Sequence, residues 1–268
     1  MDTAHVMHRH FSLIAPSYRS LRTSDLEPIL AIAECMVPVK RLRAADIGCG
    51  AGRYDLLLLR HLDIFHLTCI DRDESMLFQT QRYLRSHGIS RFRTLKANSQ
   101  EIPLEHQSMD CIVTFNAAHH MNFPRFISQC ANIISRRGKV FIYTRTRRQN
   151  ARSIWGRYFP MFVEKETRLY KLDEMVAWVR EVGYLSLHAV KRFRYERRAP
   201  LEQLVEKACR HHYSTFALYT RDEFEQALSE FQDRIRRVFK CPDRITWFDE
   251  NVLLVLSPKR TAGGAACT

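Results

Sequence analysis

Three closely spaced glycines are the first residues of this sequence whose types and spacing point to chemistry. Gly48, Gly50 and Gly52 follow Asp46 in the stretch ADIGCGAGR (45–53). A dinucleotide-binding turn has the spacing G-x-G-x-x-G, whose third glycine permits close packing of helix on strand; here the spacing is G-x-G-x-G. An anionic pyrophosphate gains little from a carboxylate just ahead of the loop. The loop therefore suits a cofactor with a cationic, methionine-like part better than a dinucleotide.

Further polar residues stand where strands are expected to end. Asp71 follows the glycines by about twenty residues, the place where a carboxylate accepts both hydroxyls of a ribose. Asn98 and Ser99 follow the next expected strand, and the one after it runs into FNAAHHM (115–121). In an open α/β sheet such strand ends form one crevice, so we expect these residues to share a site.

Apolar periodicity predicts the elements that position these residues. Strands alternating with helices up to residue 146 indicate an α/β fold with a mostly parallel sheet. The expected strands are 41–48, 66–71, 91–97, 109–116 and 140–146; the expected helices are 26–36, 55–62, 74–87 and 123–135, with a turn at 136–139. Further on, the pattern predicts a helix at 167–184, a strand at 185–195, helices within 200–239 and a final hairpin at 245–257.

Five stretches, in this order, resemble a known family. They are ADIGCGAGR, CIDRDESML (69–77), NSQEIPLEHQSMDCIV (98–113), AAHHM (117–121) and RRGKVFI (136–142). The family is that of class I S-adenosylmethionine-dependent methyltransferases, and the similarity is greatest to its small-molecule branch of ubiquinone/menaquinone biosynthesis (type 11) methyltransferases. The resemblance extends more weakly to FSLIAPSYRSLR (11–22) and covers roughly residues 11–195.

The resemblance implies a fold, a cofactor and a domain plan. The fold is a Rossmann-like, seven-stranded, mostly parallel sheet with helices on both faces, an antiparallel last strand and helical lid insertions. The cofactor is S-adenosylmethionine, and the reaction is methyl transfer to a small molecule. We expect an N-terminal helical cap (1–40), a cofactor-binding core (41–198 with 244–258), a helical lid (199–243) and a disordered tail (259–268).

Carried over residue by residue, the resemblance implies a cofactor site. Asp46 and the loop with Cys49 lie against the methionine portion, and Asp71 binds the ribose. Asn98 departs from the family, which usually has an Asp that reads the adenine amino group; an amide oxygen also accepts from that group, so we expect a weaker contact. The remaining cofactor residues are Gly48, Gly50 and Gly52 in the loop, Arg72 beside the adenine, Ser99 next to Asn98, Asn116 beside the sulfonium, and Tyr18 and Arg22 closing over the cofactor.

His119 and His120 are the predicted catalytic residues. A sulfonium methyl group is already activated, so the enzyme mainly aligns a nucleophile behind it and excludes water. A base is needed only where the nucleophile carries a proton of high pKa, and histidine titrates near neutrality. The alternative is that one histidine packs and the other is solvated. No metal is expected, because no acidic or cysteine partner stands at a ligand spacing.

Basic residues gather around and after the expected strand at 140–146. Residues 136–157 contain eight Lys and Arg and no Asp or Glu, and KRFRYERR (191–198) adds a second cluster. We expect the first cluster to rim the substrate mouth, where arginines grip an anionic substrate and aromatic rings stack on it. The predicted substrate residues are Arg145, Arg148, Arg152, Trp155 and Tyr158.

Two other functions stay open. An RNA substrate would use both basic clusters, although NAAH (116–119) is not the Asn/Asp-Pro-Pro-aromatic motif of amino-group nucleic-acid methyltransferases. A cofactor-binding subunit without catalysis is the other candidate; the departure at Asn98 favours it slightly, whereas the intact loop and Asp71 argue against it. The simplest alternative for the clusters is a basic face exposed only to solvent.

The bulk composition is that of a globular protein with an anionic partner. The chain has 268 residues, of which 46% are hydrophobic, and a formal net charge of +13. Eight cysteines are scattered without a C-x-x-C pair, as in a reduced cytosolic protein. No apolar signal region and no run of about 18 apolar residues occurs. We therefore expect a soluble, cytoplasmic protein.

Overall fold

One sheet contains all seven strands of the described residues, which are 3–36 and 39–259 of this computed structural model. The strands are β1 (Leu42–Ile47), β2 (Ile64–Asp71), β3 (Phe92–Lys96), β4 (Met109–Phe115), β5 (Ile134–Thr144), β6 (Leu185–Ala199) and β7 (Ile245–Pro258). Their order is β3-β2-β1-β4-β5-β7-β6. Strands β1 to β5 pair in parallel, and β7 is antiparallel to both β5 and β6. The predicted α/β, Rossmann-like sheet with an antiparallel last strand is confirmed.

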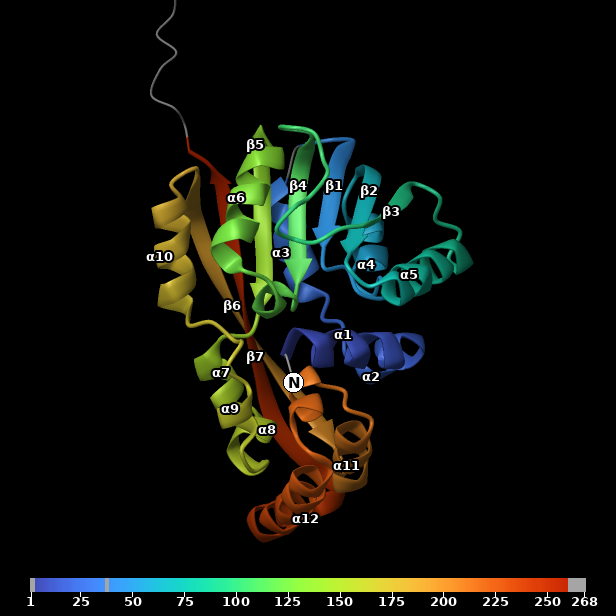
Figure 1. Cartoon of the computed structure of the whole chain (residues 1–268), viewed down its shortest axis with the longest axis vertical. Helices are drawn as coiled ribbons and strands as arrows, with labels where there is room; N and C mark the ends of the chain where they lie inside the picture. The colour runs from blue at the N-terminus through green and yellow to red at the C-terminus, as the bar shows by residue number, and fades with distance from the viewer. Residues whose placement is uncertain (1–2, 37–38, 260–268) are drawn as a thin grey trace, which may run out of the picture.

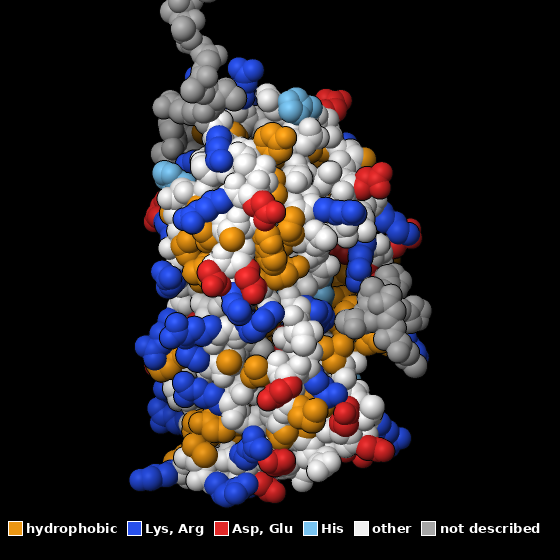
Figure 2. Space-filling view, turned by 60° about the vertical axis from the view of Figure 1, so that its left-hand side comes forward, with side chains coloured by type: hydrophobic (Ala, Val, Ile, Leu, Met, Phe, Trp, Pro, Cys, Tyr) orange, Lys and Arg blue, Asp and Glu red, His pale blue; other side chains and the backbone are white. Residues whose placement is uncertain are grey.

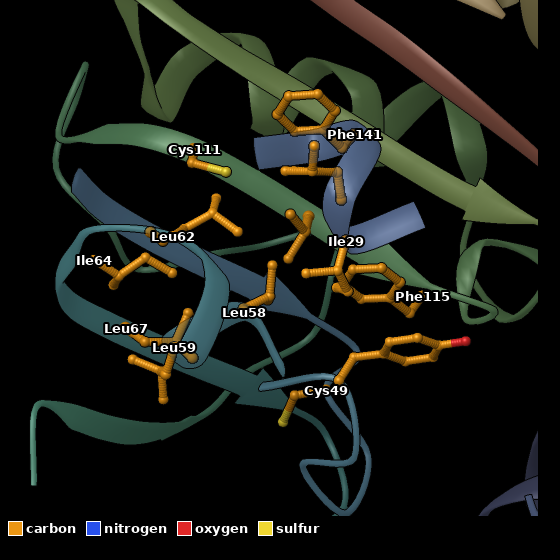
Figure 3. Close-up of a cluster of buried hydrophobic side chains, with 14 of the residues drawn as sticks. Ile29, Cys49, Leu58, Leu59, Leu62, Ile64, Leu67, Cys111, Phe115 and Phe141 are labelled. Carbon is orange, nitrogen blue, oxygen red and sulfur yellow. The ribbon is translucent and has the colours of Figure 1, made fainter. Parts of the chain in front are cut away.

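Helices cover both faces of the sheet (Figure 1). One face carries α3 (Glu27–Met36), α4 (Asp55–His61) and α5 (Glu74–Ser86), and the other carries α6 (Phe123–Ile133) and α10 (Leu172–Val182). Because successive strand residues point to opposite faces, Ala44 belongs to the first core and Ala45 to the second. Figure 3 shows the first core, where Ile29 and Leu58 pack beside Phe115.

Strands β6 and β7 are longer than their neighbours and leave the sheet at its lower end (Figure 1). They pair with each other from Leu185↔Pro258 to Ala199↔Ile245, whereas β5 reaches only Val252 of β7. Residues 193–199 and 245–251 therefore form a two-stranded ribbon beyond the carboxyl ends of the parallel strands. We call this ribbon the strand extension.

A second group of helices packs around the strand extension. This helical lobe contains α7 (Arg147–Arg152), α8 (Ile154–Tyr158), α9 (Phe162–Lys165), α11 (Leu201–Cys209), η3 (Ser214–Leu218) and α12 (Arg221–Val238), with η4 (Pro242–Arg244) at its edge. It has its own apolar core, in which Trp155 stacks on Phe231 with 5.2 Å between ring centroids. The N-terminal α1 (Thr3–Ile14), η1 (Ala15–Ser17) and α2 (Tyr18–Leu21) lie between the sheet and the lobe (Figure 1).

Three local predictions were wrong. The final hairpin at 245–257 is one strand, β7, because its partners β5 and β6 come from distant parts of the chain. The turn at 136–139 lies inside β5, which begins at Ile134 where α6 ends. The helix predicted at 167–184 starts only at Leu172. The tail predicted to be disordered lies, except for Lys259, outside the described residues, and the predicted domain division stays a prediction.

Candidate active site

The carboxyl ends of β1, β2, β4 and β5 face a cavity of about 420 Å³. Ligand pockets typically measure roughly 300–1,000 Å³, so this cavity can hold a small molecule. Its walls come from three parts of the molecule: the strand ends, the N-terminal segment 11–25, and the helical lobe with the strand extension. The N-terminal segment and the lobe therefore enclose the crevice that the sheet opens.

The glycine loop forms the floor of this cavity with backbone that only glycine accommodates well. Gly48 has φ +78°, and a Cβ atom there would stand 2.6 Å from the Cβ of Ala117. Gly50 has φ +58°, and its Cβ would stand 3.4 Å from the ring of Tyr18. Positive φ is costly for other residues. The loop thus offers bare backbone to a ligand at Gly48 and Gly50, both of which line the cavity.

Asp71 ends β2 beside the loop and holds it in place. Its Oδ2 accepts a hydrogen bond of 2.9 Å from the Gly50 amide, and its Oδ1 accepts one of 3.0 Å from the Asp73 amide. Burial raises the pKa of Asp71, against these hydrogen bonds, which favour the charged form. A carboxylate has about four acceptor positions, so each oxygen can still accept a hydroxyl from a ligand.

Asp46, at the end of β1, and Cys49 and Gly52, on the side of the loop away from the ligand, do not line the cavity. Asp46 and Asp55 are buried carboxyls, and burial raises the pKa of both, that of Asp55 to about 6. A Cβ at Gly52 would stand 3.0 Å from Thr80 of α5. The structure therefore places these three predicted cofactor residues as supports of the loop, without contact to the cavity.

The residues predicted to hold the adenine meet at one cavity. Arg72, Asn98 and Ser99 all line it, although they follow two different strands. The Oδ1 atom of Asn98 accepts a hydrogen bond of 3.1 Å from the Gln100 amide. This bond fixes the orientation of the amide, whose oxygen retains a second lone pair for a ligand.

Asn116 follows β4 in a left-handed conformation. Its φ is +53°, which asparagine tolerates better than most residues. Its amide donates to the Tyr143 carbonyl at 2.7 Å, and its Oδ1 accepts from Asn251 Nδ2 at 3.0 Å. Both asparagines line the cavity. Asn251 thus ties the end of β4 to β7, a contact between residues 135 positions apart.

Tyr18 and Arg22 close the cavity from the N-terminal segment. The Arg22 guanidinium lies 5.5 Å from the Tyr18 ring centroid and 4.5 Å from that of Tyr213. Its Nε is buried and has no hydrogen-bond partner among the described residues. Cation–π contacts offset part of the cost of burying this charge, and a ligand carboxylate would complete its hydrogen bonding.

His119 and His120 both line the cavity, next to each other on η2 (Ala118–His120). Their ring centroids are 4.0 Å apart, and His120 also meets Phe11 edge to face at 5.1 Å. Burial lowers the pKa of His119 to about 4 and that of His120 well below its usual value. Both rings are therefore neutral at pH 7, so they can accept a hydrogen bond but are weak bases.

The five predicted substrate residues separate into two groups. Arg145 and Trp155 line the cavity. Arg148 is exposed on α7, and Arg152 donates to Glu250 at 2.8 Å on the other side of β7. Tyr158 packs edge to face on Phe239 at 5.7 Å. The last three do not line the cavity, because the turns of α7 and α8 direct their side chains away from it, and their role at the substrate mouth stays a prediction.

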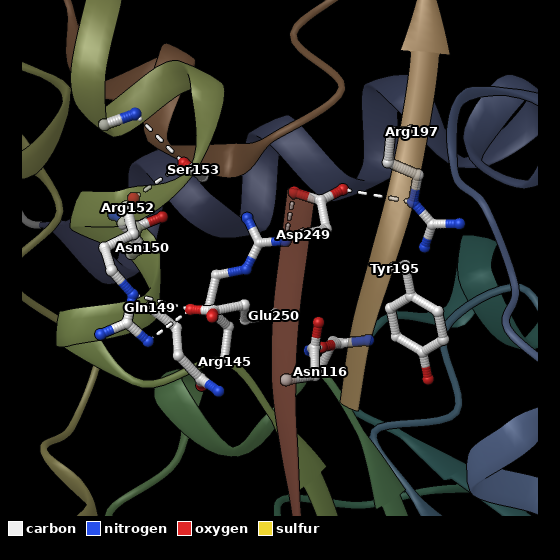
Figure 4. A network of polar contacts seen from close by, with 12 residues as sticks. Asn116, Arg145, Gln149, Asn150, Arg152, Ser153, Tyr195, Arg197, Asp249 and Glu250 are labelled. Carbon is white, nitrogen blue, oxygen red and sulfur yellow. Dashed lines mark hydrogen bonds and ion pairs between the residues drawn. The ribbon is translucent and has the colours of Figure 1, made fainter. Parts of the chain in front are cut away.

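Sequence reasoning missed a chain of charges along the strand extension (Figure 4). Asp249 forms an ion pair with Arg145 at 2.9 Å and another with Arg197 at 3.5 Å. Arg197 also donates to Asp25 at 2.6 Å. Asp249 and Asn251 stand two positions apart in one strand, which was the available signal, but the predicted hairpin obscured that they share a side of β7. Further lining residues outside the predicted site are Glu166, Lys207, His212, Tyr213 and Trp247.

Two other kinds of functional feature are absent from the part of the chain that the structure describes. No group of three or more His, Cys, Asp and Glu is arranged to hold a metal ion in residues 3–36 and 39–259. Over the same residues, no helix has the length and apolar character needed to cross a membrane.

Comparison with known families is consistent with this site. Residues 44–138 match a family described as a methyltransferase domain. The matched segment is similar to such a domain. It runs from β1 into β5 and thus contains the glycine loop, Asp71 and Asn116. The predicted enzyme class, an S-adenosylmethionine-dependent methyltransferase, and the predicted cofactor are confirmed by this domain. No curated protein matches the sequence significantly.

Solved structures share the fold of most of this chain. A candidate methyltransferase from an antibiotic biosynthesis pathway of Anabaena variabilis has 20% identity and a TM-score of 0.65, with 87% of this chain and 98% of that chain covered. The [4+2]-cyclase SpnF has 15% identity and a TM-score of 0.64, covering 97% and 98%. Geranyl diphosphate C-methyltransferase from Streptomyces coelicolor has 13% identity and a TM-score of 0.53, covering 86% and 79%. At these identities the likeness concerns the fold alone.

Proposed function

We propose that this protein transfers a methyl group from S-adenosylmethionine to a small anionic or aromatic molecule inside the enclosed cavity. The observation that carries the proposal is the enclosure itself. One cavity joins the glycine loop and Asp71 to a separate end walled by the strand extension and the helical lobe. Such a chamber has room for a cofactor and a small acceptor and keeps water from the reacting atoms.

The residues present fit the cofactor. The bare backbone at Gly48 and Gly50 permits close approach, and Asp71 has free acceptor positions for the ribose hydroxyls. Arg22, with Tyr18, would pair with the carboxylate of the methionine part, because its buried Nε has no other partner among the described residues. Arg72, Asn98 and Ser99 would hold the adenine, and the backbone at Asn116 would border the sulfonium. Asp46, Cys49 and Gly52 would act only indirectly, because they do not line the cavity.

When bound, S-adenosylmethionine supplies an activated methyl group on a sulfonium. The protein then has to place the acceptor in line with that group, because holding two reacting atoms in a productive geometry lowers the barrier to transfer. His119 and His120 are neutral and line the same cavity, so either can accept a hydrogen bond from an acceptor hydroxyl or amine. Their lowered pKa values favour an orienting role over that of a strong base.

A second candidate function is RNA methylation. Figure 2 shows many Lys and Arg side chains on the face that includes the helical lobe. Arg148, Arg192, Arg194 and Arg198 are exposed residues of the two basic clusters. An RNA bound to these clusters would lose affinity steeply with salt, whereas a small acid inside the cavity would not. The type 11 branch and the cytoplasmic location also stay predictions.

The test of the proposed function is cofactor binding to an Asp71→Asn variant. Calorimetry with S-adenosylhomocysteine should show an affinity at least ~10-fold lower than that of the unaltered protein, because a hydrogen bond to a charged group is worth about 1.5–3 kcal/mol. Glu74→Gln is the matched control, because this carboxylate is exposed at the start of α5, shortly after the same strand, and forms an ion pair with Lys96.

Two results would contradict the proposal. Equal affinity in Asp71→Asn and Glu74→Gln would remove Asp71 from the ribose site. Transfer of labelled methyl groups to RNA, with none to any member of a panel of small acids and phenols, would favour the second candidate. The melting temperature of each variant separates a binding effect from the loss of the loop that Asp71 holds.

A further inference from the structure

The part of the cavity walled by the strand extension contains buried hydrogen-bond donors that no described residue satisfies. The donors Arg145 Nη1 and Trp247 Nε1 are both buried and have no hydrogen-bond partner among the described residues; the acceptor Asp249 Oδ1 also lacks a hydrogen bond but is ion-paired with Arg145. Both residues line the cavity. Buried polar groups are nearly always hydrogen-bonded, so such exceptions mark places where a ligand supplies the partner. We call this region, lined by Arg145, Lys207, Trp247 and Asp249, the distal pocket.

The distal pocket has more positive than negative charge. Asp249 is the carboxylate of the distal pocket, and it forms ion pairs with both Arg145 and Arg197. Arg197 forms a second ion pair with Asp25. These two carboxylates balance two guanidiniums. Lys207 is half-buried and has no ion pair with any described residue, so one positive charge is left over. The positive charge of Lys207 is therefore partly withdrawn from water, and a counter-charge that approaches it would offset the cost.

The geometry of the strands sets where these groups stand. Residues 247, 249 and 251 alternate along β7 and point to the cavity side, while Glu250 points the other way and binds Arg152 (Figure 4). Two residues along a strand span about 7 Å. Asn251 lies at the end next to Asn116, so Asp249 with Arg145 and then Trp247 lie progressively farther from the cofactor loop.

Apolar and aromatic side chains form part of the remaining wall of the distal pocket. Trp155 and Leu204 of the helical lobe line it together with the ring of Tyr213, which lies 5.6 Å from the Arg145 guanidinium. A ligand with a small apolar or aromatic body therefore fits beside the donors. Phosphate esters carry close to two negative charges at neutral pH, whereas this pocket offers one unbalanced cation, which favours a carboxylate.

We propose that the acceptor substrate is a small aromatic carboxylic acid whose carboxylate binds in the distal pocket, with Arg145 and Trp247 as its hydrogen-bond donors and Lys207 as the unbalanced positive charge. This inference rests on the proposed function, because it assigns the cofactor to the opposite end of the same cavity. The carboxylate is an anchor that holds the ring toward Asn116. The methyl-accepting atom is therefore an atom on the body of the substrate and not the carboxylate.

The experiment compares acids with their neutral amides on protein loaded with S-adenosylhomocysteine. The probe pairs are benzoate with benzamide, phenylacetate with phenylacetamide, and formate with formamide, measured by calorimetry and thermal shift. We expect the affinity of each acid that binds to exceed the affinity of its amide by at least ~10-fold, the size of a charge-assisted hydrogen bond. Arg145→Gln should abolish this preference. Trp247→Phe should lower the affinity for the acids by roughly 10-fold, while it keeps an aromatic ring at position 247.

Matched controls come from residues outside the cavity. Trp178→Phe removes an indole N–H from the packing of α10 against Phe123 and Tyr170, and Arg221→Gln removes an exposed guanidinium from α12. Neither should change the preference for acids. If Arg145→Gln does not fold, Trp247→Phe still tests the pocket.

Failure of this inference is distinguishable from failure of the proposed function. Amides that bind as well as acids, an acid preference that survives Arg145→Gln, or no binding by any acid would each overturn the distal pocket as a carboxylate site. Those results require S-adenosylhomocysteine to bind normally. If S-adenosylhomocysteine itself does not bind the unaltered protein, the proposed function is wrong.

Discussion

At the scale of single residues, the site depends on backbone that cannot take a side chain. Gly48 combines a positive φ with a close neighbour, since its Cβ would stand 2.6 Å from that of Ala117. Gly88, after α5, also has a positive φ of +71°, but no atom lies within 4 Å of its Cβ position. The two glycines therefore separate the cost of backbone strain from the cost of a clash.

We predict that Gly48→Ala destabilises the protein more than Gly88→Ala. Left-handed backbone costs a non-glycine residue about 1–2 kcal/mol, and overpacking adds about 1–3 kcal/mol at Gly48 alone. Urea denaturation measures both free energies of unfolding. Gly48→Ala should also weaken S-adenosylhomocysteine binding, and Gly88→Ala should not. Equal losses of stability in the two variants would show that Ala117 yields without cost.

At the scale of elements, the helical lobe closes the cavity but is held together by its own local contacts. The longest helix, α12, begins with a capping box in which Thr220 Oγ1 accepts from the Glu223 amide at 3.3 Å and Glu223 accepts from the Thr220 amide at 2.8 Å. None of its residues lines the cavity. The stability of α12 and the affinity for the cofactor are thus separate properties.

We predict that Thr220→Ala lowers the free energy of unfolding by about 1 kcal/mol, the usual cost of losing an N-cap. Thr220→Ser keeps the accepting hydroxyl and is the control. Calorimetry with S-adenosylhomocysteine should give the same affinity for all three proteins. A fall in affinity as large as the fall in stability would mean that the lobe and the cofactor loop are coupled.

At the scale of the whole molecule, buried histidines link stability to pH. Burial lowers the pKa of His119 to about 4 and that of His10 to about 3, below the ordinary value of 6.5. The unfolded chain therefore binds more protons than the folded one between these values and pH 6.5. By linkage, the contribution of each histidine is complete above pH 6.5 and is lost as the pH falls through its folded pKa.

We predict that His119→Gln removes part of this pH dependence. The contribution of His119 at pH 5 is about 1–2 kcal/mol smaller than at pH 8, and the variant lacks this difference. Denaturation at both pH values measures it, with the unaltered protein as reference. The buried carboxyls Asp46 and Asp55, whose pKa values are raised, act in the opposite direction in both proteins and cancel in the comparison. An identical pH dependence in the two proteins would show that His119 is solvated.

The predictions from sequence succeeded where a signal is local. The strand–loop–helix unit around Gly48, the position of Asp71 and the groups after β3 and β4 all come from short windows, and these residues meet in one cavity. The substrate residues succeeded only in part. Arg145 follows β5 directly and stays at the cavity, whereas Arg148 lies on α7, where the helical turn decides which way a side chain points.

The sequence by itself determined the α/β class, the order of the first five strands along the chain and the grouping of polar residues at their carboxyl ends, because hydrophobic periodicity and glycine stereochemistry act over a few residues. Only the tertiary structure decided the far end of the cavity. Asp25, Arg197 and Asp249 lie up to 224 positions apart (249 − 25), and the ion pairs between them depend on the antiparallel register of β6 with β7. Such a register follows from packing of the whole sheet and lobe, and no short stretch of sequence contains it.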